Sequence, residues 1–262
     1  MKISVYIIAF NEVEKIRHCI NSILWADEII VADSYSTDGT TEIAEELGAK
    51  VIQIPFIGYG ELRNQAINHC NGDWIISLDC DERCTHEIRD EILSLIENAT
   101  FDIYRIPRKN FFMGKWINHS GWYPNFRQPQ LFKNRKMSYT LESVHEGFIS
   151  HSNKKIGVIK NSIWQFPFKN TEEVINKANR YSTLGVEKLQ KKGIKGSVLK
   201  AFIHGLWSFI KHYIFKLGFL DGGAGFVIAF GNFEGTFYRY IKLTEAESDW
   251  TAPKVEALTK VS

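Results

Sequence analysis

The sequence predicts an α/β fold with a mostly parallel sheet, and the regular alternation in its first hundred residues is the main reason. Short apolar runs alternate there with segments of helical periodicity. Strands that alternate with helices of about ten residues are typical of βαβ units, which build parallel sheets. With 44% apolar and 24% charged residues, the composition is that of an ordinary globular protein.

Each expected element has a local signal. Ile3–Ala9 is an apolar run that predicts a strand, and apolar residues then repeat at helical spacing over 13–24. The strands and helices expected after these are, in chain order, Glu28–Ala32, Thr40–Leu47, Val51–Ile54, Glu61–Cys70 and Trp74–Leu78. Gly48 and Asn71-Gly72 supply the residues that usually end the two helices before them.

An acidic triplet, Asp79-Cys80-Asp81, follows the last of these strands directly. In open α/β sheets, ligands bind beyond the carboxyl ends of the strands. On an extended backbone the two carboxylates point to the same side, where they repel each other unless a cation lies between them. Such oxygen ligands suit Mg²⁺ or Mn²⁺. Phosphate oxygens then complete the coordination shell of the cation. The triplet therefore predicts a metal–diphosphate site; the alternative is an acidic turn that caps the next helix.

Other polar residues are expected at the same edge of the sheet. Asn11-Glu12 follows the first strand and Asp33 follows the second. A nucleotide along this edge would find partners for its base, ribose and phosphates, although Glu12 and Asp38 are also suited to cap helices. The sequence has neither GxGxxG after the first strand nor GxxxxGK[ST], so it supports neither a Rossmann dinucleotide site nor a P-loop.

Five short motifs occur in order: Ala9–Glu12, Val31–Thr40, Gly60–Asn64, Gly72–Trp74 and Leu78–Arg83. Over about residues 1–245 the chain resembles the family 2 glycosyltransferases with the GT-A fold. Within that family it is most similar to the lipopolysaccharide core β-1,4-glucosyltransferase group. The resemblance implies a GT-A-type Rossmann-like sheet flanked by helices, a UDP-sugar donor, inversion at the anomeric carbon and a divalent cation, Mn²⁺ or Mg²⁺.

Carried over position by position, the resemblance assigns Glu12, Asp33 and Arg63 to the uridine. Asp79 and Asp81 are assigned to the ribose and the metal-bound diphosphate. Many relatives have a histidine where this chain has Gln165, so either Gln165 or His151 is expected to complete the metal site.

Residues 101–168 are expected to form the acceptor half of a catalytic domain 1–168, whose nucleotide-sugar half is 1–100. The aromatic segments Phe111–Trp116 and Ser120–Pro124 are predicted to be loops with exposed rings that stack on sugars, or else to cover the far edge of the sheet. Gln130 replaces an arginine that is usual in the family, which puts one phosphate or acceptor contact in doubt.

Glycosyl transfer with inversion needs a base to remove the proton of the acceptor hydroxyl. By resemblance to the family's His-Glu motif, we assign this base to Glu146. His145 would orient Glu146 or the acceptor, and Glu142 is the reserve candidate.

Charge is distributed unevenly along the chain. Residues 1–100 carry 7 Lys/Arg and 18 Asp/Glu, a balance of −11, whereas residues 151–220 carry 13 and 3, a balance of +10. Between Lys188 and Tyr240, basic residues flank aromatic and aliphatic residues at helical spacing, and 218–223 is expected to stop the helix. Such a helix is typical of the bilayer interface, and the alternative is a helix packed on the protein's own core.

We therefore expect 169–262 to form a helical, basic, membrane-associating region. No run is long enough to span a bilayer, so the protein would be peripheral on an anionic surface, at the cytoplasmic face of the inner membrane. Nucleic acid is not an expected partner, because no recognisable binding module accompanies the charge. The four cysteines form no CxxC pair and are predicted to be free thiols; the alternative is a Cys80–Cys84 bridge.

The sequence as a whole predicts an inverting, metal-dependent glycosyltransferase that moves a sugar, with glucose expected, from a UDP-sugar to a lipid-linked saccharide acceptor. The lipopolysaccharide inner core is the expected acceptor. One alternative is a sugar nucleotidyltransferase, although the glycine-rich loop usual after its first strand is missing here. Another is a non-catalytic, membrane-bound nucleotide or glycan binder, which would tolerate loss of Glu146.

Overall fold

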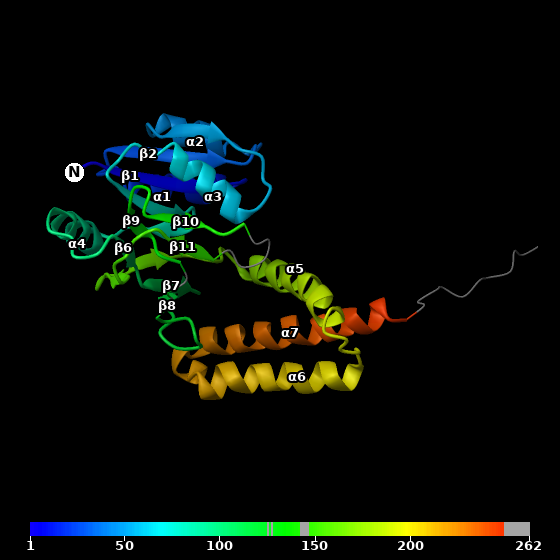
Figure 1. Ribbon diagram of the computed structural model, residues 1–262. Coiled ribbons are helices and arrows are strands. Elements are labelled where there is room, and N and C mark those ends of the chain that lie inside the picture. Colours follow the sequence, from blue (N-terminus) through cyan, green and yellow to red (C-terminus); the bar gives the residue numbers. More distant parts are fainter. Residues whose placement is uncertain (125, 127, 142–146, 249–262) are drawn as a thin grey trace, which may run out of the picture. The chain divides into compact units, whose positions relative to one another are not determined.

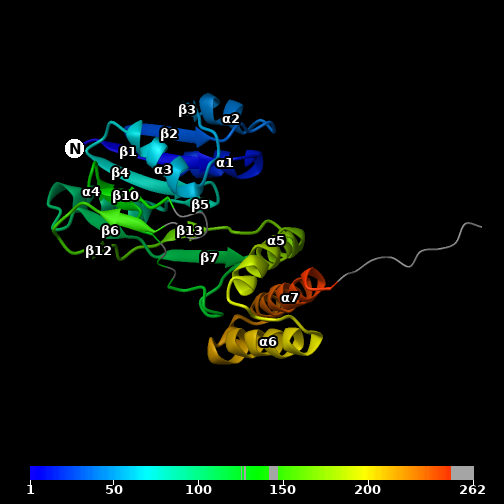
Figure 2. The ribbon, with the colours of Figure 1, turned by 45° about the vertical axis from the view of Figure 1, so that its right-hand side comes forward.

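The structure is a computed structural model that describes residues 1–124, 126, 128–141 and 147–248. The chain forms two compact units. The first comprises Met1–Asn118 and Trp122–Pro167, and the second comprises His119–Gly121 and the chain from Phe168 onward. The first unit contains the sheets, and the second contains three long helices (Figures 1 and 2).

The first hundred residues of the first unit fold as an alternating series of strands and helices. In chain order these are β1 (Ile3–Ala9), α1 (Val13–Asn21), β2 (Glu28–Asp33), α2 (Thr40–Glu46), β3 (Lys50–Gln53), α3 (Tyr59–Asn68), β4 (Trp74–Asp79), β5 (Glu82–Arg83) and α4 (His86–Glu97). The predicted strand Ile3–Ala9 coincides with β1. The other predicted elements are also found, with ends shifted by one or two residues, except that the helix expected over 13–24 ends three residues earlier, at Asn21.

Short strands follow in the remainder of this unit. They are β6 (Ile103–Arg105), β7 (Arg108–Phe112), β8 (Lys115–Trp116), β9 (Leu131–Lys133), β10 (Met137–Tyr139), β11 (Phe148–Ser150), β12 (Gly157–Val158) and β13 (Ile163–Gln165). Strand β9 pairs antiparallel with both β4 and β6, and so extends the main sheet.

The main sheet has the order β12-β6-β9-β4-β1-β2-β3. Its centre is parallel, because β1 pairs in parallel with β2 and β4, and β2 pairs in parallel with β3. The predicted α/β fold with a mostly parallel sheet is therefore confirmed. In the register of the ladders, Ala9 lies opposite Asp33 and Ile8 lies opposite Asp79. The carboxyl ends of β1, β2 and β4 thus meet at one edge, as expected.

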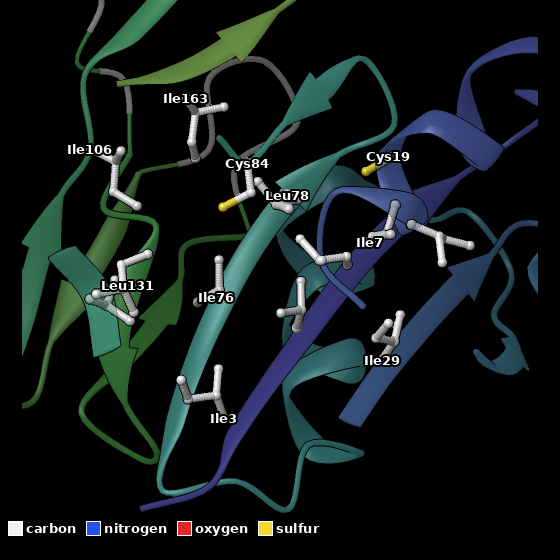
Figure 3. Close-up of a cluster of buried hydrophobic side chains, with 14 of the residues drawn as sticks. Ile3, Ile7, Cys19, Ile29, Ile76, Leu78, Cys84, Ile106, Leu131 and Ile163 are labelled. Atoms are coloured by element: carbon white, nitrogen blue, oxygen red, sulfur yellow. The ribbon is translucent and has the colours of Figure 1, made fainter. Parts of the chain in front are cut away.

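Helices cover both faces of the main sheet. Alternate residues of each strand point to opposite sides, so the apolar side chains of one strand are buried under helices on both faces. Ile3 and Ile7 of β1 belong to a cluster with residues of α1, α2 and α4, together with Ile76 and Leu78 of β4 (Figure 3). Tyr6 of β1 and Ile75 of β4 belong to the cluster on the other face, with residues of α3. Burial on both faces explains why these strands are continuous apolar runs.

A second sheet, of order β5-β13-β7-β8, lies beside the end of β4. Here one prediction was wrong: Phe111–Trp116 is not a loop but part of the antiparallel hairpin β7–β8, which turns at Met113-Gly114. Phe112 is 5% exposed and therefore buried. The inward residues of β7 include Arg108 and Asn110, so the strand lacks the alternation of apolar and polar residues by which strands are recognised.

The second unit contains α5 (Thr171–Gln190), α6 (Val198–Ile210), a π-turn (Lys211–Phe215), a 3₁₀ turn (Gly218–Asp221) and α7 (Gly223–Ala246). Asn170 and Ser197 cap the amino ends of α5 and α6 with their side chains. Helices α6 and α7 lie side by side in Figures 1 and 2. The predicted stop at 218–223 is confirmed. Among the described residues, no helix combines the length and apolarity that crossing a membrane requires.

Candidate active site

The acidic triplet lies where β4 ends. The strand includes Asp79, and Cys80-Asp81 form a turn that leads into β5, so only the first of the two carboxylates is on extended backbone. The Cys80 thiol donates to the Ile8 carbonyl at 3.2 Å, which holds the turn against the end of β1. The cap of α4 is Thr85, whose hydroxyl accepts the Ile88 N–H. The alternative interpretation of the triplet as the cap of this helix is therefore wrong.

Arg63, on α3, fixes the carboxylate of Asp79. Its Nη2 lies 2.7 Å from Asp79 Oδ1, and its Nη1 donates to the Ser77 hydroxyl at 3.0 Å. The guanidinium also lies over the Tyr139 ring, 5.5 Å from the centroid. Burial alone would lower the pKa of Arg63, but the adjacent Asp79 outweighs it and raises this pKa above its ordinary value. Arg63 is thus a permanent cation beside the acidic pair.

Asp81 is partly buried and contacts Gln165 at the end of β13. The amide nitrogen of Gln165 lies 3.3 and 3.2 Å from the two carboxylate oxygens of Asp81. Burial, and then the neighbouring charge of Asp79, raise the pKa of Asp81. Two carboxylates that interact unfavourably in a partly dry site are relieved by a cation between them.

The residues at this turn fit a divalent cation of the Mg²⁺ type. Among the described residues, no group of three or more His, Cys, Asp or Glu is arranged to hold a metal. Mg²⁺ does not require such a group, because it typically takes one or two carboxylates and completes its shell with phosphate oxygens and water. Turning the Gln165 amide over would present its oxygen beside Asp81. His151, the alternative candidate, shares a hydrogen bond of 2.9 Å with the Ser138 hydroxyl.

Glu82, which directly follows the triplet, holds the acidic turn in place through its side chain. It is fully buried, and its carboxylate accepts the Asp79 N–H at 3.0 Å and the Gln130 amide at 2.8 Å. Its other oxygen forms an ion pair with Arg108 of β7. Burial raises the pKa of Glu82, whereas Arg108 opposes that shift. Glu82 therefore ties β4, β7 and the segment before β9 to one buried carboxylate.

The sequence alone did not reveal this network. Gln130 is 2% exposed and also donates to the Ser77 carbonyl at 3.0 Å. Its amide nitrogen therefore bonds buried groups of the protein itself. Arg108 comes 26 residues after Glu82 and no local motif links the two. The only signal was that Glu82 directly follows the acidic triplet.

Asp33 shapes the loop after β2. It is fully buried, and its carboxylate accepts both the backbone N–H of Ser36, at 2.8 Å, and the Ser36 hydroxyl. The Ser36 hydroxyl in turn accepts the Asn11 N–H at 2.8 Å, and Asn11 Oδ1 accepts the Thr37 N–H at 2.9 Å. These bonds join the loops after β1 and β2. The role of Asp33 at the uridine stays a prediction.

Glu12 lies at the start of α1. Its carboxylate is 3.2 Å from Lys15 Nζ, and its N–H donates to the Thr40 hydroxyl at 2.8 Å. Asp38 accepts the Val13 N–H at 3.0 Å and also contacts Thr40, so it does cap the first turn of α1. The structure thus places Glu12, Asp33, Arg63, Asp79 and Asp81 around the carboxyl ends of β1, β2 and β4.

The predicted acceptor-side residues are placed only in part. Glu146, His145 and Glu142 lie outside the described residues. Near the acidic turn, the rings of Phe111 and Trp164 are 4.8 Å apart, and Phe111 stacks on Phe166 at 5.2 Å. The Phe166 N–H donates to the Asp81 carbonyl at 2.8 Å, which joins this aromatic cluster to the acidic turn through the backbone.

The family model "Glycosyl transferase family 2" matches residues 4–154, which include β1 from Ser4 onward, β2 to β11 and the acidic turn. The chain belongs to this family. An uncharacterized glycosyltransferase of Rickettsia felis is 31% identical to this family 2 glycosyltransferase over 255 residues, 94% of this chain and 90% of the relative. The lipopolysaccharide core biosynthesis glycosyltransferase LpsC of Rhizobium meliloti is 28% identical over 250 residues, 88% and 90% of the two chains.

Solved structures support the fold of this family 2 glycosyltransferase. S. aureus TarS 1-349, in a structure in complex with UDP-GlcNAc, superposes with a TM-score of 0.51 and 17% identity, over 94% of this chain and 91% of that one. The GT-A-type fold expected from the sequence is therefore confirmed. The family model and the relatives named glycosyltransferase confirm the expectation that the protein is a glycosyltransferase.

Proposed function

We propose that this glycosyltransferase transfers glucose from UDP-glucose to a lipid-linked saccharide of the lipopolysaccharide inner core, with inversion at the anomeric carbon. The observation that carries the proposal is the pair Asp79 and Asp81 at the end of β4, with Arg63 bound to the first and Gln165 to the second. A nucleoside diphosphate needs cationic partners and oxygen ligands for its metal at this edge of the sheet. The relative LpsC, named for lipopolysaccharide core biosynthesis, and TarS, solved with UDP-GlcNAc, support the acceptor and donor classes.

The proposed cation site comprises Asp79, Asp81 and the Gln165 amide. A divalent cation held there would offset the charge that develops on the departing diphosphate. Arg63 keeps Asp79 oriented, and Glu82 keeps the turn in place by accepting the Asp79 N–H. Glu12 and Asp33, at the ends of β1 and β2, are proposed to border the uridine.

In the proposed reaction, the acceptor oxygen attacks the anomeric carbon as the bond from that carbon to the phosphate oxygen breaks. The electron pair of that bond leaves with UDP, and the proton of the acceptor hydroxyl passes to Glu146. His145 is proposed to orient Glu146. A carboxylate suits both tasks, because it takes the proton and stabilises the positive charge that develops on the sugar.

We propose that the enzyme works as a peripheral protein at the cytoplasmic face of the inner membrane. A lipid-linked acceptor requires access to a membrane surface, and the basic stretch within 151–220 suits anionic lipid. The four cysteines are buried, free thiols, as expected, and this suits a reducing compartment.

Binding of a nucleotide-sugar panel tests the proposed donor. UDP-glucose is expected to bind more tightly than ADP-glucose, GDP-mannose or CMP-sialic acid by calorimetry, and its affinity should rise when Mn²⁺ or Mg²⁺ is added. EDTA supplies the metal-free reference. Equal affinity for all the nucleotides, or no effect of either cation, would contradict the proposed uridine and cation site.

Glu146→Gln separates catalysis from binding. The variant keeps the shape of the side chain but cannot accept a proton, so transfer is expected to fall by on the order of 10²–10⁴-fold. The affinity for UDP should stay that of the wild type, because Glu146 is assigned to the acceptor. Glu142→Gln is the matched control and should keep most of the activity. If Glu142→Gln alone abolished transfer, the base would have to be reassigned to Glu142.

A further inference from the structure

Helix α6 packs with its small residues inward and its large apolar residues outward. Ala201 and Gly205 are buried, and a methyl group at Gly205 would lie 3.0 Å from the Phe233 ring of α7. On the outside, each large apolar side chain of α6 from Leu199 to Trp207 is 42–67% exposed: Leu199, Phe202, Ile203, Leu206 and Trp207. A helix that is covered only by water shows the opposite arrangement.

The turn between α6 and α7 continues this exposed surface. Its large apolar residues are 45–66% exposed: Ile214, Phe215, Leu217, Phe219 and Leu220. On α7, Phe226 and Phe230 are also about half exposed and lie 6.3 Å apart, and Phe226 contacts Phe209 of α6 at 5.6 Å. We name as the outer apolar face the residues Leu199, Phe202, Ile203, Leu206, Trp207, Ile214, Phe215, Leu217, Phe219, Leu220, Phe226 and Phe230.

Basic residues accompany the outer apolar face. Residues 188–220 contain seven lysines and no aspartate or glutamate; the lysines are Lys188, Lys191, Lys192, Lys195, Lys200, Lys211 and Lys216. Lys200 and Lys211 are exposed, and their helical spacing places them with His204 on one flank of the apolar stripe. A lysine in this position extends its ammonium to the headgroups while its stem lies along apolar surface.

We infer that the outer apolar face enters the headgroup–acyl boundary of one leaflet of an anionic bilayer, with Lys200 and Lys211 at the lipid phosphates. This deepens, and rests on, the membrane association proposed above. Helix α6 has 13 residues and is therefore about 20 Å long, which is shorter than the hydrocarbon core. It is thus suited to lie in the interface, as amphipathic helices with a basic polar side do.

Charge favours a bilayer over a protein as the occupant. An isologous contact with a second copy of the chain would bring the same basic flank into the interface from both sides. Anionic headgroups complement that flank, whereas residues 188–220 offer no carboxylate to pair with it. The contact of Gly205 with Phe233 also lets the backbones of α6 and α7 approach closely.

Vesicle binding by the full-length protein tests the inference. Phosphatidylcholine vesicles with one third phosphatidylglycerol are expected to sediment the protein, and pure phosphatidylcholine vesicles to sediment much less of it. Brominated acyl chains should quench the fluorescence of Trp207, identified as the quenching that Trp207→Phe removes. If Trp207→Phe is quenched as strongly as the wild type, α6 is not in the acyl region.

The combined variant Phe202→Gln, Leu206→Gln and Phe215→Gln tests the outer apolar face itself. All three side chains are already exposed, so folding should be retained and the partition coefficient should fall by about tenfold per side chain. The control variant changes three exposed apolar residues elsewhere, Leu24→Gln, Leu93→Gln and Ile175→Gln, and should bind vesicles like the wild type. Equal binding by the triple variant and the wild type would overturn the inference.

Two more measurements separate the alternatives. Lys200→Glu with Lys211→Glu should remove the preference for phosphatidylglycerol, and an unchanged preference would contradict the headgroup contact. If the wild type is a dimer that the triple variant converts to a monomer, and neither binds vesicles, the face is an interface between copies and not a lipid surface. Calorimetry with UDP should give the same affinity for the triple variant and the wild type. If neither protein bound UDP, the proposed donor would be refuted, whereas the vesicle-binding result would be unaffected.

Discussion

Asp81→Asn is expected to slow glycosyl transfer by on the order of 10²–10³-fold and, at the same time, to raise the melting temperature of the metal-free protein. The carboxylate of Asp81 is partly buried beside Asp79, and both burial and that neighbouring charge raise its pKa. When folding raises the pKa of a carboxyl group, the ionised form of that group lowers the free energy of unfolding at neutral pH, and the protonated form does not. The neutral amide removes this cost and keeps the contact with Gln165.

The loss of activity follows from the same substitution. Without its charge, residue 81 holds a divalent cation more weakly, and the departing diphosphate loses electrostatic stabilisation worth on the order of 10²–10³-fold in rate. UDP-sugar turnover and thermal unfolding, each with and without Mn²⁺, measure the two effects. Asp90→Asn, on the exposed surface of α4, is the control and should change neither quantity. Wild-type turnover by Asp81→Asn in the presence of metal would show that Asp81 is not part of the cation site.

Arg108→Met is expected to lower the free energy of unfolding by about 3–5 kcal/mol, because it leaves the fully buried carboxylate of Glu82 without its cation. Methionine fills much of the volume of the arginine stem, so the loss reports mainly the charge. Urea denaturation of the metal-free protein measures it. Since Glu82 also accepts the Asp79 N–H, the affinity for UDP and metal should fall with stability.

A second change in the same background identifies the cause. Glu82→Gln in the Arg108→Met protein removes the uncompensated charge and should recover part of the lost stability. Arg17→Met, which breaks the exposed ion pair with Glu46 at 2.7 Å, is the matched control and should change stability little. If Arg108→Met were no more damaging than Arg17→Met, Glu82 would not depend on Arg108.

The fold of the first hundred residues was predictable because the central strands β1, β2 and β4 are buried on both faces. Apart from Ser4, Ser77 and the final Asp79, Ile3–Ala9 and Trp74–Asp79 are apolar, so a continuous apolar run identifies each of them without knowledge of its neighbours. The same argument placed Asp33 and Asp79 at one edge, which the register of the ladders confirms. What followed from local pattern alone was therefore the sheet and the position of the site along it.

The buried support of the site was not predictable, because it depends on pairs that are distant in sequence. Arg108 and Gln130 face inward although they are polar, because both bond the buried carboxylate of Glu82. Only the folded structure brings Glu82 close to them. The hairpin β7–β8 was missed for the same cause. Likewise, helical spacing predicted an amphipathic segment near Phe202, but not that its small residues would take the buried side.

Residues His119–Gly121 belong to the second unit although they lie between β8 and β9 in the sequence. Their contacts explain this assignment: the carboxylate of Asp221 accepts the His119 N–H at 3.2 Å and the Ser120 hydroxyl at 2.7 Å, and the Ser120 N–H donates to the Lys216 carbonyl at 2.9 Å. The polypeptide therefore passes from one unit to the other three times. A truncation after Pro167 would not release an intact catalytic fragment, because the hydrogen-bond donors of His119 and Ser120 would lose their acceptors. To express each unit separately, the segments of that unit that are apart in the sequence would have to be joined in one chain.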